Sequence, residues 1–223
     1  LLIRPPILIP RPETEHWVSQ LASFLSLPPD RPLRILDIGT GSGCIPLALA
    51  HALRPGLLAI GVDTGLPALT LARENVVRCG MEKEVRIVQG DVFARTFVEE
   101  MRREGGGGFD VVVSNPPYIT RRGYEGLSES VRGWEDRGAL LGEREGEEGR
   151  DDGLVFYSRI VGIVKELLEE KGEPTITGAP VLALEVGEGQ AQEVGRMVEA
   201  VGLRMEVQKD QWGIERVVLG YRE

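Results

Sequence analysis

The feature of this sequence that most constrains its fold is a regular alternation, after residue 32, of short apolar runs with longer segments of helical apolar spacing. Such alternation favours an α/β architecture in which a mostly parallel sheet carries helices on both faces. Only a short turn separates the last two runs, so the last of seven strands is expected to be antiparallel. The predicted strands are 34–38, 57–62, 85–89, 109–114, 181–186, 203–209 and 215–221. The predicted helices are 45–53, 66–79, 94–103, 154–171 and 188–201.

Two segments interrupt this alternation, and a third precedes it. Residues 104–108 (EGGGG) are expected to form a flexible surface loop. The acid-rich residues 142–152 are expected to form a solvated or disordered insertion. The sheet-bearing domain is placed at residues 31–223, with a separate segment at residues 1–30. The chain does not begin with Met and shows no signal or transit peptide, so it is expected to be a fragment or processed form.

Composition narrows the classes of partner. The formal net charge of −9 argues against a large non-specific nucleic-acid surface, which needs clustered Lys and Arg, although a local basic patch remains open. No stretch approaches the roughly 18 apolar residues that a membrane-spanning helix needs. Cys44 and Cys79 lie in predicted helical segments and are expected to be inert thiols of a reducing compartment. His16 and His51 have no metal-ligand spacing around them, so no metal site is expected.

A glycine-rich loop follows the first predicted strand and opens the first helix: Asp37-Ile38-Gly39-Thr40-Gly41-Ser42-Gly43. Its glycines permit a tight turn and the close approach of a ligand, and the first N–H groups of the helix are free to bind a polar group. A dinucleotide loop reads G-x-G-x-x-G, but Cys44 stands at the third glycine. The spacing G-x-G-x-G, two residues after an acid, instead resembles the cofactor loop of Rossmann-like methyltransferases.

Acids also end the next two predicted strands. Asp63 stands where a carboxylate can accept hydrogen bonds from both ribose hydroxyls of a nucleoside. Asp91 could accept from an adenine amino group, with Val92 and Phe93 flanking the ring. A single strand-terminal Asp is often just a helix cap, and a single glycine turn is often structural. Their succession at the ends of three strands indicates a nucleoside cofactor, with S-adenosylmethionine favoured over a dinucleotide.

The segment Asn115-Pro116-Pro117-Tyr118 follows the fourth predicted strand. Proline keeps Asn115 out of the helical region and fixes the direction of the loop. The side-chain oxygen of Asn115 and the carbonyl of Pro116 can then accept both hydrogens of one planar NH₂ group, on which Tyr118 can stack. A rigid strand exit is the alternative interpretation. Because the Asn-Pro-Pro-Tyr segment lies downstream of the cofactor loop, we favour methyl transfer to an amide-type nitrogen. Alignment of the reacting groups, rather than a metal or a strong base, is expected to supply the rate.

Four segments together resemble one known family. They are residues 8–15 (LIPRPETE), the glycine loop at 39–43, residues 114–119 (SNPPYI) and residues 213–220 (GIERVVLG). They look like those of the HemK/PrmC protein-(glutamine-N5) methyltransferases, and the resemblance covers essentially the whole chain. It implies a Rossmann-like class I methyltransferase fold. It also implies methylation of the glutamine in the Gly-Gly-Gln motif of a class I peptide chain release factor.

The resemblance assigns roles to individual residues. Asn115 is implied in catalysis, in binding the cofactor and in holding the substrate glutamine. The residues implied in binding S-adenosylmethionine are Gly39, Thr40, Gly41, Ser42, Gly43, Asp63, Asp91, Val92 and Asn115. The residues implied in holding the substrate are Arg11, Glu15, Asn115, Pro116, Pro117 and Tyr118, the last four also being the catalytic set. Arg11 and Glu15 also fit ordinary surface and cap positions.

The chain departs from the family pattern in three places. Val92 stands where bacterial members often have an aromatic residue, and the insertion at 142–152 is not part of the core pattern. The helical N-terminal domain of the family is expected to be missing, leaving residues 1–30 as a substrate-side segment. The insertion and the rest of the sequence resemble fungal mitochondrial members. The protein is therefore expected in the mitochondrial matrix, with the cytoplasm as the alternative. It is also expected to be a monomer.

Two other functions remain open from the sequence. An amino-directed DNA or RNA methyltransferase, acting on adenine N6 or guanine N2, would present a flipped base with a planar NH₂ group to the same four residues. The net charge of −9 and the lack of an appended basic domain speak against it. A non-catalytic scaffold with this fold is the second alternative, although every residue that the chemistry needs is present.

Overall fold

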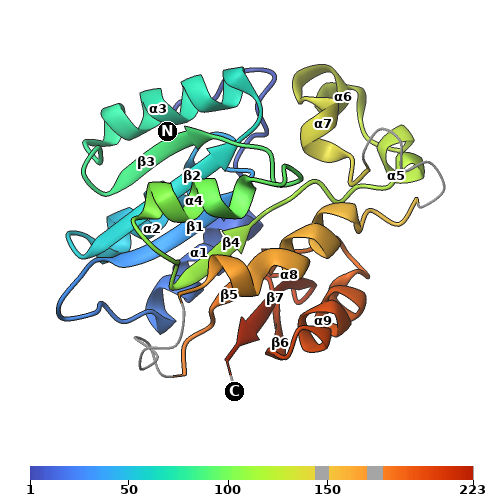
Figure 1. Ribbon diagram of the computed structural model, residues 1–223. Helices are drawn as coiled ribbons and strands as arrows, with labels where there is room; N and C mark the ends of the chain where they lie inside the picture. Colours follow the sequence, from blue (N-terminus) through green and yellow to red (C-terminus); the bar gives the residue numbers. More distant parts are fainter. Residues whose placement is uncertain (144–150, 170–177, 223) are drawn as a thin grey trace.

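The computed structural model describes residues 1–143, 151–169 and 178–222, which form a seven-stranded sheet of order β3-β2-β1-β4-β5-β7-β6 (Figure 1). Neighbouring strands from β3 to β5 pair in parallel, whereas β7 pairs antiparallel with both β5 and β6. This arrangement confirms the predicted α/β class and the antiparallel last strand. The strands are β1 Leu33–Ile38, β2 Leu57–Asp63, β3 Val85–Gln89, β4 Val111–Ser114, β5 Leu182–Glu185, β6 Arg204–Lys209 and β7 Glu215–Tyr221.

Helices cover both faces of the sheet, as predicted. One apolar cluster joins α1, α2 and α3 to one face, and a second joins α4, α8 and α9 to the other. Figure 1 views the sheet with α4 and α8 in front of it. The helices are α1 Pro12–Phe24, α2 Cys44–Leu53, α3 Leu66–Cys79, α4 Phe97–Gly105, α5 Arg121–Glu125, α6 Glu129–Trp134, α7 Arg137–Leu140, α8 Val155–Leu167 and α9 Ala191–Ala200.

Three of the predicted elements have the boundaries that the structure shows. The ranges 66–79, 85–89 and 215–221 match the structure at both ends. The predicted loop at 104–108 is wrong at its start, because α4 continues through Gly105 and ends at Gly106 in the left-handed region, with φ of 68°. The predicted helix at 154–171 is shorter, ending at Leu167.

Four helices of the structure were not predicted: α1, and the three short helices α5, α6 and α7. Helix α1 lies within the segment at 1–30 and buries Trp17, Val18 and Leu21 against the sheet. It therefore packs as part of the sheet domain's core. Helices α5, α6 and α7 lie within residues 121–140, for which neither a helix nor a strand was predicted. They gather beyond one end of the sheet (Figure 1).

The acid-rich insertion predicted at 142–152 lies largely outside the described residues, which stop at 143 and resume at 151. Its flanks come together, since a Cβ on Gly142 would lie 2.6 Å from the Cα of Gly153. The described residues on the two sides of this gap therefore lie side by side. Residues 170–171 of the predicted fifth helix also lie outside the described part. No helix in the described ranges is long and apolar enough to cross a membrane.

Candidate active site

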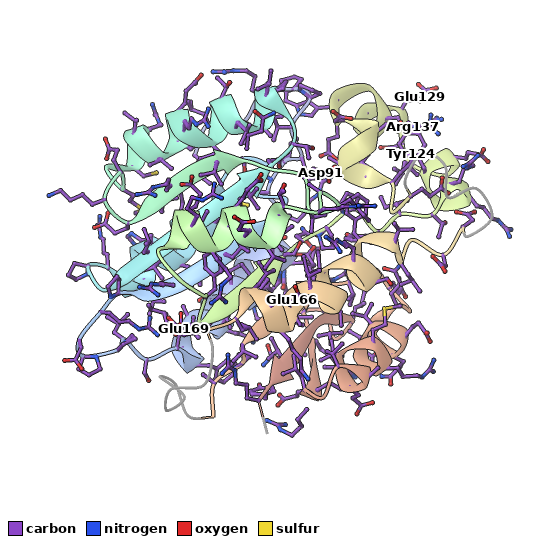
Figure 2. The ribbon with its side chains drawn as sticks, viewed as in Figure 1. Asp91, Tyr124, Glu129, Arg137, Glu166 and Glu169 are labelled. Atoms are coloured by element: carbon purple, nitrogen blue, oxygen red, sulfur yellow. The ribbon has the colours of Figure 1, made fainter. Side chains whose placement is uncertain are left out.

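A cavity of about 270 Å³ opens at the carboxyl ends of β1, β2 and β4. Its walls are completed by residues from the N-terminal segment and from the start of α7, namely Pro6, Ile7, Leu8, Pro10, Arg11, Asp136, Gly138 and Ala139. Figure 2 shows Asp91 on the side of the molecule where α6 and α7 lie, whereas Glu169 lies away from them, toward the lower left of the view. The cavity thus lies where the topology of an open α/β sheet places ligand sites.

Most of the predicted site residues meet in this one cavity. Those that line it are Arg11, Gly39, Thr40, Gly41, Ser42, Asp63, Asp91, Val92, Asn115, Pro116 and Pro117. Three others are not among the lining residues. Glu15 is exposed on α1, Gly43 packs beneath the loop, and Tyr118 lies behind the proline segment. Among the described residues, no group of three His, Cys, Asp or Glu side chains could hold a metal ion.

The glycine loop is held open by its backbone conformation. Gly39 and Gly41 have φ of 77° and 55°, values in the left-handed region that favours glycine. Asp63 fixes the loop from β2, because its Oδ2 accepts a hydrogen bond from the N–H of Gly41 at 2.9 Å. Gly43 instead faces the neighbouring helix α3, where an added Cβ would lie 3.3 Å from the Cβ of Ala72. It therefore allows loop and helix to pack closely.

A buried acid lies below the loop. Asp37, on β1, is fully buried, and this burial raises the pKa of its carboxyl to about 7. The nearby Thr40 hydroxyl opposes the shift and the charge of Asp63 adds to it, although neither the Asp37 carboxylate oxygens nor the Thr40 hydroxyl has a hydrogen-bond partner among the described residues. Burial also raises the pKa of the Cys44 thiol to about 12, consistent with the inert thiol expected from the sequence.

Asn115 is held by residues from two other elements. Its Nδ2 donates to Oγ1 of Thr14 at 3.4 Å, and Thr14 donates to Oε2 of Glu185 at 2.6 Å. Trp17 donates its indole N–H to the same oxygen at 2.7 Å. Glu185 ends β5 and is buried, and this burial raises the pKa of its carboxyl. Beside it, Ser114 donates to the carbonyl of Ile38 at 2.6 Å, which ties β4 to β1.

Tyr118 anchors the end of the proline segment. A Cβ on Gly187 would lie 2.9 Å from Cδ2 of its ring, so this glycine makes room for the tyrosine. The backbone carbonyl of Tyr118 accepts a hydrogen bond from Nε2 of Gln190 at 3.1 Å. Burial raises the pKa of the Tyr118 hydroxyl to about 12, so the ring stays neutral. Its stacking on a substrate group stays a prediction.

An ion pair between the partly exposed Arg11 and the buried Glu135 links the N-terminal segment to the wall of the cavity. Nη2 of Arg11 lies 2.7 Å from each carboxylate oxygen of Glu135, whose side chain is only 1% exposed. Glu135 also accepts the N–H of Ile9 at 3.3 Å, and the N–H of Asp136 donates to the carbonyl of Pro6 at 2.6 Å. Arg11 is thus both a wall of the cavity and the link between this segment and the chain that enters α7.

Comparison with known proteins bears directly on this geometry. Residues 20–128 match the methyltransferase small domain family. A release factor glutamine methyltransferase of Moorella thermoacetica is 36% identical over 222 residues, covering 99% of this chain and 69% of that protein. The chain belongs to the release factor glutamine methyltransferase family. The resemblance drawn from its motifs is therefore confirmed.

Other relatives place limits on the comparison. A release factor glutamine methyltransferase of Chlorobaculum tepidum is 34% identical over 94% of this chain and 65% of that protein. The chain thus spans less than two thirds of the length of that family member. The structure of human methyltransferase 10 domain containing protein covers 97% of this chain and 85% of its own, with a TM-score of 0.59. At 18% identity this likeness concerns the fold alone.

Some residues that line the cavity of this family member were not predicted from the sequence, and Phe156 is the clearest case. Phe156 on α8 lines it beside Val92 and packs edge-on against Phe93, with ring centroids 5.3 Å apart. Phe93 itself is not among the lining residues, so the aromatic rings that line the cavity are those of Phe97 and Phe156. Arg159 holds this wall by donating to the carbonyl of Val92 at 2.7 Å. No local motif marks Phe156, because it reaches the cavity from a distant helix.

Proposed function

We propose that this chain transfers a methyl group from S-adenosylmethionine to a glutamine of a class I peptide chain release factor. The acceptor would be the side-chain amide nitrogen, N5, of the glutamine in the Gly-Gly-Gln motif. This nitrogen would gain the methyl group and lose one hydrogen as a proton to solvent, and the cofactor would leave as S-adenosyl-L-homocysteine. Family membership supports this choice, because the relatives are release factor glutamine methyltransferases. The observation that carries it is that the glycine loop and the segment Asn115-Pro116-Pro117 line one cavity.

The cavity residues fit S-adenosylmethionine, which supplies a methyl group bound to a positively charged sulfur. No heavy atom lies within 4 Å of the point that a Cβ would occupy at Gly39, so a ligand can approach its backbone. The oxygens of Asp63 each accept one backbone N–H and keep lone pairs for ribose hydroxyls. We assign Gly39, Thr40, Gly41 and Ser42 to the methionine end, Asp63 to the ribose, and Asp91, Val92 and Phe156 to the adenine.

The segment after β4 would orient the acceptor nitrogen. Oδ1 of Asn115 and the carbonyl of Pro116 would each accept one N–H of the glutamine amide, which leaves the nitrogen lone pair to face the methyl group. These hydrogen bonds strengthen as positive charge develops on nitrogen, so they favour the transition state over the ground state. Pro117 keeps the loop rigid, and Arg11 borders the substrate side. Glu15 would contact the release factor from the exposed face of α1.

The test is methylation of a purified release factor in the presence of isotopically labelled S-adenosylmethionine. Peptide mass spectrometry should place one added methyl group on the glutamine of the Gly-Gly-Gln motif. Asn115→Ala should abolish the transfer while leaving cofactor affinity, measured by calorimetry, nearly unchanged. Matched reactions should contain DNA or RNA in place of the release factor. Label in nucleic acid but not in protein would contradict the proposal and establish an amino-directed nucleic-acid methyltransferase instead.

A further inference from the structure

One buried carboxylate oxygen connects three elements behind the proposed acceptor site. Oε2 of Glu185, at the end of β5, accepts hydrogen bonds from Thr14 at 2.6 Å and from Trp17 at 2.7 Å. Thr14 and Trp17 both lie on α1, and both are buried. Thr14 also contacts Asn115, the first residue after β4. The chain of contacts therefore runs from the core to the cavity wall.

The chemistry of these groups fixes the direction of each hydrogen bond. An indole N–H can only donate, so Oε2 of Glu185 is an acceptor. A carboxylate oxygen carries no hydrogen, so the Thr14 hydroxyl that meets the same oxygen donates its single hydrogen to it. Its own oxygen is left with lone pairs only, so it can accept but not donate toward Asn115. The group of Asn115 that faces Thr14 must therefore be the NH₂ group.

An amide has a donor edge and an acceptor edge, so fixing one fixes the other. With its NH₂ group held by Thr14, Asn115 keeps Oδ1 on the opposite side of the amide. The reversed amide would bring Oδ1 against the lone pairs of Thr14 and leave a buried hydrogen bond unmade, which is costly. Asn115 borders the cavity, so its orientation decides whether a ligand there meets an acceptor or a donor.

We propose that Thr14 and Glu185 are positioning residues that set the amide orientation of Asn115 and so present Oδ1 to the substrate nitrogen. The inference rests on the proposed function, in which Oδ1 of Asn115 accepts an N–H of the glutamine amide. Glu185 is not among the residues that line the cavity, and Thr14, which is, acts through its contact with Asn115. Their effect belongs to the chemical step, because an Asn115 amide free to rotate would spend time with its NH₂ group facing the substrate NH₂ group.

Two substitutions remove the two hydrogen bonds that reach the same oxygen. Thr14→Val keeps the shape of the side chain and removes the hydroxyl, which breaks the connection to Asn115. Trp17→Phe removes the indole N–H and leaves Thr14 and Asn115 connected, so it is the matched control. Thr14→Ser restores the hydroxyl and should rescue.

Thr14→Val should lower kcat for release factor methylation by about 10- to 100-fold, less than the ~100- to 1000-fold expected when a group that itself contacts the reacting centre is removed. KM for the release factor and Kd for S-adenosylmethionine should change by less than about 3-fold, because ground-state contacts remain. Thr14→Ser and Trp17→Phe should keep kcat near that of the wild type, and Trp17→Phe should lower the melting temperature. An unchanged kcat in Thr14→Val, or an equal loss in Trp17→Phe, would overturn the positioning role.

A second measurement separates this inference from the proposed function. The side-chain NH₂ resonances of Asn115, assigned by their loss in Asn115→Ala, report its orientation by NMR without any substrate. One of the two hydrogens should be shifted and slow to exchange in the wild type and in Trp17→Phe, and should lose both properties in Thr14→Val. If the release factor is not methylated but these resonances behave as expected, the proposed function fails and the orientation stands. If Thr14→Val leaves them unchanged, the orientation argument fails whatever the activity.

Discussion

The carboxylate of Asp63 accepts the N–H of Gly41 through one oxygen and the N–H of Gly65 through the other, both at 2.9 Å. One side chain at the end of β2 thereby joins the glycine loop to the turn that leads into α3. In the proposed complex the same carboxylate accepts the ribose hydroxyls. Its contribution to binding therefore combines direct contacts with a loop already in place.

Asp63→Ala should weaken S-adenosylmethionine binding by about 1.5–3 kcal/mol, because charge-assisted hydrogen bonds to the ribose are lost. Isothermal titration calorimetry measures the change. Glu166→Ala, at an exposed position on α8 that does not line the cavity, is the control and should leave the affinity unchanged. Equal affinities of the two variants would remove Asp63 from the cofactor site.

Gly43 tests the structural share of the glycine loop. Its φ of 79° strains any other residue, and a Cβ would lie 3.3 Å from the Cβ of Ala72. Gly80 is the matched control, because its φ is 63° but its Cβ would meet nothing within 4 Å. Gly80→Ala should cost about 1 kcal/mol of unfolding free energy from backbone strain alone, and Gly43→Ala about 2 kcal/mol or more. Urea unfolding measures both, and equal losses would show that the contact with α3 carries no weight.

Among the elements, the N-terminal segment depends on one ion pair. Arg11→Ala removes the partner of Glu135 and leaves a buried carboxylate with only the N–H of Ile9, which should cost about 2 kcal/mol of unfolding free energy. Adding Glu135→Gln removes the unpaired charge, so the double variant should be more stable than Arg11→Ala alone. Hydrogen exchange should also show faster exchange at Ile9 in Arg11→Ala. A double variant less stable than the single one would contradict this account.

The elements that the sequence predicted are those whose apolar periodicity the sheet imposes. Helix α3 and strands β3 and β7 follow their burial pattern to the ends. Helices α5, α6 and α7 span five, six and four residues, too few to show a helical period. Their signal is at the caps, where Thr120, Ser128 and Asp136 each accept a backbone N–H. Helix α1 begins with Pro12 and carries a buried apolar stripe, so the sequence does contain a signal for it.

At the scale of the whole molecule, the site is predictable where the fold is parallel. Acids and the Asn-Pro-Pro segment follow successive strands, and parallel strands bring those ends to one edge. The residues that support the site come from elsewhere in the chain. Thr14 and Glu185 are 171 positions apart, and Arg11 and Glu135 are 124 apart. Such pairs come into contact only after the helices have packed, so no local sequence pattern predicts them.

The buried Asp37 makes the stability of the whole domain depend on pH. Its pKa is about 7 when folded against an ordinary value of 3.8, so between these values the unfolded chain releases a proton that the folded protein keeps. Raising the pH therefore favours unfolding, and the stability that this group contributes is present below 3.8 and lost as the pH rises through 7. The loss is at most ~4 kcal/mol, since each unit of pKa corresponds to about 1.4 kcal/mol.

Asp37→Asn should remove this part of the pH dependence, because an amide has no proton to release in this range. Urea unfolding without cofactor at pH 5 and pH 8 measures it: the wild type should lose stability between the two, and the variant should lose less. Other titrating groups act equally on both proteins, so the difference between the two profiles isolates Asp37. Glu166→Gln, exposed on α8, should give a profile parallel to that of the wild type. A parallel profile for Asp37→Asn would mean that the buried carboxyl keeps its ordinary pKa, and that the floor of the glycine loop carries a charge at neutral pH.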